Sequence, residues 1–538
     1  GIGPMPTPAL PFRLHADQPA LFALEVAAFA LAAFALFCLL VVYSLAWSYA
    51  RLRRERAKDI DTYVGQPSPP VLSRAKVAFL HRMNVGGHRP AAEPVALGER
   101  PSAHVPGLKV TCALSAEGCT PCAATPTSAV VLGTIRMGFG HLRIAHAAAS
   151  WVQRGPRAAY FHDLLAIDSA EAELIKAADR AYSRGSRLAS ELGGPVERFW
   201  GALTRNGDED ALRATWQMGE HLKALLAGLD KGTPIIATHC LVGMAAVAAG
   251  FTRVINLVID NHAQWFVIVP GALNLVQGPS NLHALLRMGV PASEVRLAGH
   301  WIPRELVQNA AVDSAARASR SRAGRPLRFL VPVGGAGAQR RFIVDFVTAL
   351  GPLVRAGRAQ LFLNAGDHPH MLKAFETVAR KLGGEAPSAA GGDGRAYDLV
   401  DSLDGVRRLC ERLEAGGSPP CPVTVFAFAE AFPAVAATDL LCRGSDVLCC
   451  KPSELAFYPI PKLMLRRVGD HELHSAVRAS ELGDGTHEAR TVEAALRYAE
   501  LFAEPGSPLL AAMAAAVARN AREGVYDGCK VAAALAAA

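Results

Sequence analysis

The sequence lacks the phosphate-binding motifs that its most conspicuous glycine-rich turn brings to mind. The turn follows the apolar run SAVVL and reads GTIRMGFGHLRIAHAA from Gly133. A GxxxxGK[ST] loop would need Lys after Gly138, where Phe139 stands, and a dinucleotide fingerprint would need glycine in place of Arg143. Neither motif is present, so this turn is not predicted to cradle a nucleotide phosphate.

Paired cysteine motifs and interleaved basic and aromatic residues are missing as well. The 11 cysteines are an odd number and lie mostly in apolar runs, which favours a reducing compartment over a disulfide framework. Cys112, Cys119 and Cys122 have ligand-like spacing, but no second CxxC or histidine pair completes a zinc site, so a plain linker is expected. The sequence predicts no metal and no nucleic-acid partner.

Charged residues are absent from Val26 to Trp47, inside an apolar run whose one charge is Glu25. A helix over this run reaches roughly 40 Å, more than the ~30 Å hydrocarbon core. The basic cluster RLRRERAK follows from Arg51. We therefore expect a single-pass membrane protein with its large domain on the cytoplasmic-type side, and an organelle inner membrane stays open as its location. Attraction to anionic membrane lipid explains the basic cluster.

The chain is predicted to have five segments. Residues 1–58 are the membrane anchor with its basic cluster, and residues 59–127, rich in Pro, Gly and Ser, form a tether with little regular structure. Beyond them, strand-like runs such as AVVLGTI, GTPIIATH and RVINLVID alternate with helical stretches. The prediction is an α/β fold with two doubly wound Rossmann-like domains, 128–318 and 319–505, behind one N-terminal transmembrane helix, and Ala-rich helices over 506–538. The cleft between two such domains is the natural ligand site.

The GFGH turn combines small residues with a histidine. Gly138 and Gly140 let a ligand approach the backbone, and the helix that starts near His141 offers free N–H groups to an anion or a developing oxyanion. The helix dipole disfavours protonated imidazole, which keeps His141 neutral and able to take a proton. The alternative is that His141 caps the helix and the glycines permit a tight turn.

A second stretch, VIDNHAQWFVIVPG, places Asp260, His262 and Trp265 after a buried strand. Together with the GFGH turn it resembles the GT-B glycosyltransferases that act on lipid acceptors, the monogalactosyldiacylglycerol synthase and MurG-like group. The resemblance spans residues 130–501. In VPVGGAGAQ, the residues that stand at the family's donor-diphosphate turn are Gly334, Gly335, Gly337 and Gln339.

The resemblance implies transfer of a sugar from a nucleotide sugar, UDP-linked, to a lipid acceptor in the membrane, with no other cofactor. His141 is the implied base, and Asp260 or His262 positions the acceptor. The turn at 334–337 and Lys451 stabilise the departing diphosphate. The remaining candidate binding residues are Gly138, Gly140, Trp265, Ser453 and Glu454.

The donor motif departs from the family at KPSE. Lys451 matches, but Ser453 and Glu454 replace glycines, and Tyr458 stands where the family has a ribose-binding acid. Repulsion between Glu454 and a diphosphate at ~4 Å, with an effective dielectric of ~20, is on the order of 4 kcal/mol. The donor site is therefore predicted to be altered or lost. This leaves open a catalytically inactive GT-B-fold scaffold, an accessory subunit of a membrane protein complex.

Overall fold

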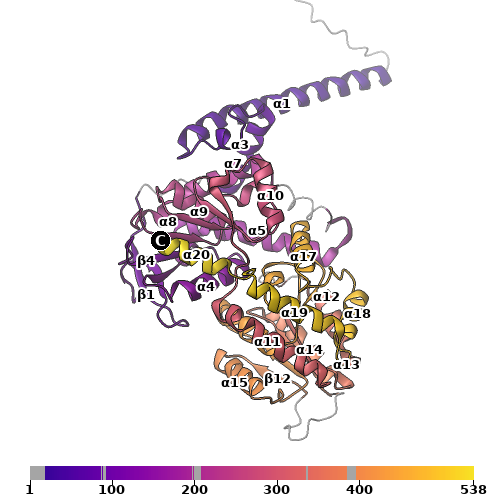
Figure 1. The fold of residues 1–538 in the computed structure, drawn as a ribbon. Coiled ribbons are helices and arrows are strands. Elements are labelled where there is room, and N and C mark those ends of the chain that lie inside the picture. The colour runs from indigo at the N-terminus through magenta and orange to yellow at the C-terminus, as the bar shows by residue number, and fades with distance from the viewer. Residues whose placement is uncertain are drawn as a thin grey trace, which may run out of the picture.

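Two sheets with parallel strands and helices packed against them form the body of the protein, and one long apolar helix precedes them (Figure 1). The computed structural model describes residues 19–538 apart from 87, 89–92, 197, 199–206, 335–336, 338 and 385–395, so the candidate residue Gly335 lies outside the described residues. The predicted α/β class, with two sheets and one N-terminal apolar helix, is confirmed.

The N-terminal sheet has nine strands in the order β3-β1-β2-β5-β4-β6-β7-β8-β9. The strands β2, β5, β4, β6, β7, β8 and β9, neighbours in this order, run parallel to one another. Strand β1 is antiparallel to both of its neighbours, β2 and β3. Every residue of β4 is buried, as expected for a central parallel strand covered on both faces. The strands are β1 (Leu97–Pro101), β2 (Lys109–Ala113), β3 (Thr120–Pro121), β4 (Ala129–Thr134), β5 (Ala158–Asp163), β6 (Ile235–Ala237), β7 (Val254–Leu257), β8 (Leu273–Val276) and β9 (Val295–Leu297).

Helices connect these strands and pack around the sheet. They are α4 (Gly140–Val152), α5 (Ala170–Leu192), α7 (Glu209–Leu222), α8 (Ala224–Ala227), α9 (Cys240–Ala248) and α10 (Pro279–Met288). The polar, Arg-rich stretch after β9 forms the long helix α11 (Arg304–Arg322). It packs against α4 and against two helices of the C-terminal part, α16 (Ala431–Gly444) and α19 (Pro508–Arg522), and so joins the two halves of the molecule.

The C-terminal sheet has six parallel strands in the order β12-β13-β11-β10-β14-β15. They are β10 (Leu327–Pro332), β11 (Ala359–Asn364), β12 (Asp398–Val400), β13 (Val423–Phe426), β14 (Val447–Cys450) and β15 (Lys462–Met464). The helices of this part are α12 (Arg340–Ala349), α13 (Gly351–Arg355), α14 (Pro369–Gly384), α15 (Leu403–Glu414), α16 (Ala431–Gly444), α17 (Leu473–Glu481) and α18 (Val492–Phe502).

The last two helices cross from one domain to the other, as Figure 1 shows in yellow. Helix α19 (Pro508–Arg522) packs on α11, and α20 (Gly528–Ala537) packs on α4 of the N-terminal domain. The guanidinium of Arg157 donates a hydrogen bond to the carbonyl of Ala536, and the backbone N–H of Gly528 donates to that of His300 at 3.0 Å. These contacts fix α20 to the N-terminal domain.

Residues 59–127 are not the loosely structured tether that their composition predicts. They contain α2 (Ile60–Tyr63), α3 (Val71–Val85) and the strands β1 to β3, which extend the N-terminal sheet. A disulfide between Cys112 and Cys119 closes the chain between β2 and β3, where a plain linker was expected. The strands are short and lie at the sheet edge, so their hydrogen bonds come from pairing with the sheet and leave little periodicity in the sequence.

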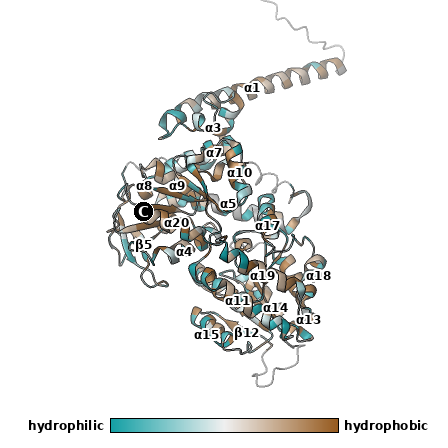
Figure 2. Cartoon of the chain, viewed as in Figure 1, coloured by the Kyte–Doolittle hydropathy of each residue, from teal (hydrophilic) through white to brown (hydrophobic). Residues whose placement is uncertain are grey.

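Helix α1 (Pro19–Glu55) is brown along its first half in Figure 2, the colour of hydrophobic residues. Its segment Leu21–Glu55 contains an 18-residue window with a mean hydropathy of 2.7 and is long and apolar enough to cross a membrane. Side chains of residues 21–41 are exposed apart from the half-buried Glu25, whereas α3 covers one side of the helix from Val42 onward. The uncovered 21 residues are about 31 Å long, close to the ~30 Å hydrocarbon core.

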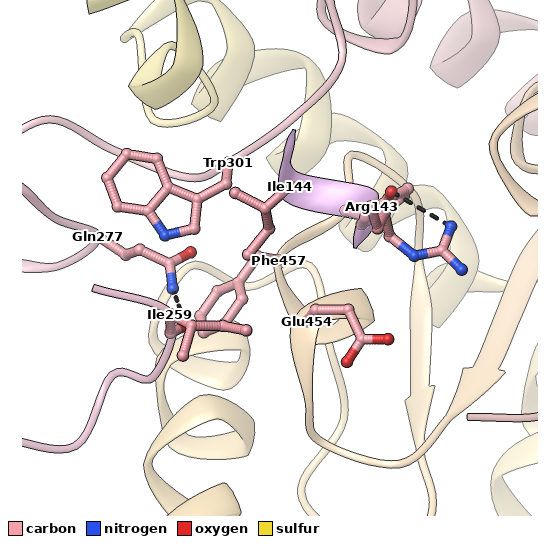
Figure 3. A pocket seen from close by; sticks show the side chains of 8 residues that line it. Arg143, Ile144, Ile259, Gln277, Trp301, Glu454 and Phe457 are labelled. Atoms are coloured by element: carbon pink, nitrogen blue, oxygen red, sulfur yellow. Dashed lines mark hydrogen bonds between the residues drawn. The ribbon is translucent and has the colours of Figure 1, made fainter. Parts of the chain in front are cut away.

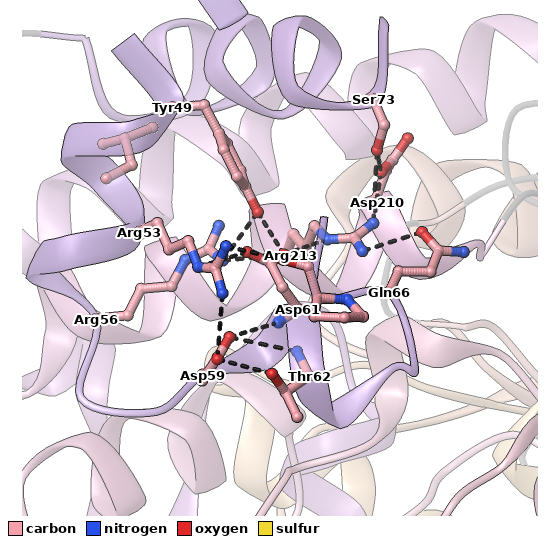
Figure 4. A network of polar contacts seen from close by, with 12 residues as sticks. Tyr49, Arg53, Arg56, Asp59, Asp61, Thr62, Gln66, Ser73, Asp210 and Arg213 are labelled. Carbon is pink, nitrogen blue, oxygen red and sulfur yellow. Dashed lines mark hydrogen bonds and ion pairs between the residues drawn. The ribbon is translucent and has the colours of Figure 1, made fainter. Parts of the chain in front are cut away.

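The base of α1 is fixed to the N-terminal domain by a buried ion network (Figure 4). Asp61 is fully buried and accepts hydrogen bonds from the Tyr49 hydroxyl at 2.5 Å and from Nε of Arg213, on α7, at 2.7 Å. Arg53 and Arg56 lie 3.2 and 3.6 Å from the same carboxylate. Part of the basic cluster therefore serves the fold: Arg56, whose side chain is 1 % exposed, faces Asp61 and not membrane lipid.

Candidate functional site

The N-terminal sheet brings two histidines together at the carboxyl ends of neighbouring strands. Strand β4 lies between β5 and β6, so the chain changes direction across the sheet there, and this is the position where open parallel sheets bind ligands. Beyond β4, Gly138 has a φ of 80°, which glycine adopts without strain, and leads into α4. Beyond β6, His239 caps α9. The rings of His141 and His239 have centroids 4.3 Å apart.

His141 is held as a neutral imidazole with one defined tautomer. Its Nδ1 lies 2.5 Å from the carbonyl oxygen of Thr238, and a carbonyl can only accept, so Nδ1 carries the proton. Burial lowers the pKa of His141, although the Thr238 carbonyl and the charges of Asp260 and Glu454 act in the opposite direction. The unprotonated Nε2 is therefore the atom of this ring that can take a proton.

Glu454 comes from the C-terminal domain but lies against the start of α4. Its Oε2 is 3.4 Å from the position where a β-carbon on Gly140 would stand. The N-terminal end of a helix carries partial positive charge, so α4 favours a carboxylate at this place. Asp260, which follows β7, adds a second negative charge close to His141. Glu454, which stands where the resemblance implies a glycine, thus places a carboxylate close to the candidate base.

The C-terminal sheet has its own switch point, where β10 lies between β11 and β14. Gly334 follows β10 and Lys451 follows β14, and a β-carbon on Gly334 would stand 3.2 Å from Cε of Lys451. Lys451 forms an ion pair with Glu472, which also accepts the backbone N–H of Val468 at 2.7 Å. Burial opposes the charge of Glu472, yet Lys451 and this N–H hold its pKa below the usual value.

The other predicted donor-side residues build the turns around Lys451. The Gly337 carbonyl lies 3.2 Å from Nε2 of His370. Gln339 is buried with a φ of 66°, and its side chain donates to the carbonyl of Arg466 at 2.6 Å. The backbone N–H of Ser453 donates to the carbonyl of Lys451 at 2.8 Å. These groups shape the carboxyl edge of the C-terminal sheet.

Two of the predicted acceptor-side residues, Trp265 and His262, make their ring contacts with residues other than His141. Trp265 is buried in the core of the N-terminal domain, with its ring edge-on to Tyr63 at 6.3 Å. His262 stacks on His474 of α17, with ring centroids 4.3 Å apart and an angle of 11° between the planes. Trp265 therefore belongs to the core and His262 to the contact between the domains, whereas Asp260 stays beside His141.

The two domains are joined by an ion pair behind the candidate site, next to the crevice that Figure 3 shows. Arg143 of α4 is 2 % exposed and donates to Oδ1 of Asp439, on α16, at 2.8 Å. The Tyr458 hydroxyl donates to the same oxygen at 2.8 Å. The adjoining crevice has no room for a water molecule and is lined by Arg143, Ile144, Ile259, Gln277, Trp301, Glu454, Phe457 and Tyr458.

The charged and neutral groups of the site are arranged so that they could take part in proton transfer. Within the described ranges, no group of three or more His, Cys, Asp or Glu residues is placed to hold a metal ion. The arrangement can remove a proton through His141 and stabilise the resulting imidazolium through the carboxylates of Asp260 and Glu454. Sequence reasoning missed His239 and Arg143. The position of His239 directly after an apolar strand was the one available signal.

The comparison with known families divides the chain in two. Residues 104–285 match a family model described as "Domain of unknown function (DUF6937)", and residues 290–537 match one described as "Domain of unknown function (DUF6938)". The two matches meet around the end of α10, before β9. No curated protein matches the chain.

Proposed function

We propose that the protein is a membrane-anchored GT-B-type glycosyltransferase that moves a sugar from a UDP-linked donor to a hydroxyl group of a lipid. The observation that carries this proposal is His141: a neutral imidazole with its lone pair on Nε2, at the switch point of the first sheet and beside a residue of the second. A base that takes a hydroxyl proton needs this protonation state.

The surroundings of His141 fit the charge that forms during such a reaction. When Nε2 takes the proton, the ring becomes positive, and Asp260 and Glu454 both favour the positive form. Glu454 then acts on the acceptor side, through His141, and not on the donor phosphates. This role accounts for a carboxylate at a position where the resemblance calls for glycine.

The donor side of the proposal rests on Gly334 and Lys451. They lie next to each other at the second switch point, where the resemblance assigns the diphosphate. Positive charge and backbone N–H groups at such a place stabilise a departing diphosphate. Because Lys451 is paired with Glu472, donor binding must turn the ammonium from this carboxylate toward the phosphates, or share it between them.

The apolar helix α1 supports the proposal that the acceptor is a membrane lipid. A span of residues 21–41 leaves the covered half of α1 and its buried network at the membrane surface, which holds the body of the protein close to lipid head groups. The basic residues that follow the span favour the cytoplasmic-type side for this body.

A second candidate, the non-catalytic scaffold, is favoured by the same Lys451–Glu472 ion pair. The carboxylate of Glu472 already pairs with the ammonium of Lys451, the cation that a diphosphate would need. Arg143 also joins the two domains through an ion pair with Asp439. In this reading the protein keeps the two-domain fold as an accessory subunit of a membrane complex.

Calorimetric titration with UDP decides between the two candidates. The full chain in detergent micelles is expected to bind UDP saturably, and Lys451→Ala should weaken binding about tenfold or more, because a charged hydrogen bond contributes ≈ 1.5–3 kcal/mol. Lys381→Ala, at an exposed position in the last turn of α14, is the matched control and should bind as the unaltered protein does. Absence of UDP binding by the folded protein would favour the scaffold.

A further inference from the structure

His239 has the tautomer opposite to that of His141. Its Nδ1 accepts the backbone N–H of Leu241 at 3.1 Å, in the N-cap position of α9. A backbone N–H can only donate, so Nδ1 is unprotonated and the neutral ring carries its proton on Nε2. The two adjacent rings therefore present complementary atoms: a lone pair on Nε2 of His141 and an N–H on Nε2 of His239.

The fold fixes both tautomers through groups that cannot exchange roles. His141 donates to a carbonyl at the end of β6, and His239 accepts from the first turn of the helix that begins there. Thr238 precedes His239 directly in the chain, so one short segment orients both rings. Both residues are half-buried and not fully enclosed, as a residue that touches a ligand requires.

The electrostatics of the pair decide which ring takes a proton. Burial disfavours the charged form of both rings, and a charge on one disfavours a charge on the other. Two carboxylates, Asp260 and Glu454, stabilise a charge on His141. His141 is therefore the ring that takes the proton during the reaction, and His239 stays neutral with its N–H available.

We propose that His239 is a second catalytic residue, which donates a hydrogen bond from Nε2 to the acceptor oxygen whose proton passes to His141. This inference rests on the proposed function. In the step, the acceptor O–H bond breaks and an N–H bond forms on Nε2 of His141. The oxygen bonds to the anomeric carbon, and the bond from that carbon to the phosphate oxygen breaks, its electron pair leaving with the nucleoside diphosphate.

The variant His239→Asn tests this role without removing the helix cap, since Asn is among the best N-cap residues and retains a side-chain oxygen acceptor. Asn lacks the N–H group that His239 carries on Nε2, on the side of the ring away from the helix cap. The matched control is His283→Asn, at an exposed position on α10. With UDP-galactose and vesicles that contain diacylglycerol as the probes, His239→Asn should lower kcat about 10²-fold, the effect of losing one preorganised donor, and leave KM for UDP-galactose within a few fold.

A measurement that needs no turnover accompanies the assay. In protein labelled with ring-¹⁵N histidine, nitrogen shifts should report Nδ1–H for His141 and Nε2–H for His239, with signals assigned from the variants His141→Gln and His239→Asn. The same tautomer in both rings, or an unchanged kcat in His239→Asn, would overturn the role of His239. Absence of transfer by the unaltered protein, together with absence of UDP binding, would instead overturn the proposed function, and the nitrogen shifts would then decide the pairing alone.

Discussion

Replacement of Asp61 by Asn tests how the long apolar helix is attached to the rest of the molecule. The carboxylate is fully buried and is the meeting point of Tyr49, Arg53, Arg56 and Arg213 (Figure 4). Asn is nearly the same size and can still accept a hydrogen bond, so the variant removes charge without opening a cavity. The side chains of Arg56 and Arg213, each 1 % exposed, then lose their main counter-charge.

The expected cost follows from the price of a buried cation without a partner. Breaking a buried ion pair by removing one partner costs about 3–5 kcal/mol. Arg213 keeps a second carboxylate, Asp210, at 2.8 Å, so the lower end of that range applies. In a domain of 150–250 residues each kcal/mol lowers Tm by roughly 2–4 °C, which gives a decrease of about 6–12 °C.

The assay is thermal unfolding of the full chain in detergent, followed by tryptophan fluorescence at one scan rate. Trp216, fully buried on α7 next to the network, makes the signal sensitive to this region. Asp59→Asn is the control: the Asp59 side chain is 48 % exposed, lies 3.3 Å from Arg53, and caps α2 through an oxygen that Asn retains. An exposed pair contributes less than about 1 kcal/mol. A decrease in Tm for Asp61→Asn no larger than for Asp59→Asn would refute the reasoning.

Three further predictions concern other parts of the chain. Arg143→Met leaves the carboxylate of Asp439, whose side chain is 22 % exposed, without its cation and should destabilise the domain contact by about 3 kcal/mol, the lower end of the range for a buried pair. Amides of α4 and α16 should then exchange faster with solvent, and unchanged exchange would contradict this. Burial, helped by two neighbouring imidazoles, lowers the pKa of His221 to about 4, so the folded state loses stability as pH falls from 6.5 toward 4, and His221→Phe should flatten that part of a plot of Tm against pH. Cys112 and Cys119 should resist thiol labelling in the native protein until a reductant is added, and labelling without reductant would disprove the disulfide.

Much of the fold could be predicted from the alternation of apolar runs and helical stretches. AVVLGTI, GTPIIATH and RVINLVID contain β4, β6 and β7, because central parallel strands are buried on both faces and read as continuous apolar segments. The same rule could not find β1 to β3, which are short edge strands, nor α3, whose buried face consists largely of small and β-branched residues. Their stability comes from neighbours that are distant in sequence.

The site residues that could be predicted from the sequence are those that lie in sequence motifs directly after strands. His141, Asp260, Lys451 and Glu454 come after strands, and the fold places each at the carboxyl edge of its sheet. His239 was missed because its importance depends on strand order: β6 pairs with β4, although about a hundred residues separate them. The partner of Lys451, Glu472, was likewise hidden, since nothing in the local sequence links the two.

The crossing of the last helices has a consequence for how the protein is made. Helix α20 covers α4 of the N-terminal domain, yet the ribosome synthesises it several hundred residues after α4. At 5–20 residues per second, that face of the domain stays uncovered for tens of seconds while the second domain is still being translated. During this interval the nascent chain exposes the apolar surface of α4 that α20 covers in the folded protein. We expect the N-terminal domain to be prone to aggregation and to chaperone binding until α20 has been synthesised.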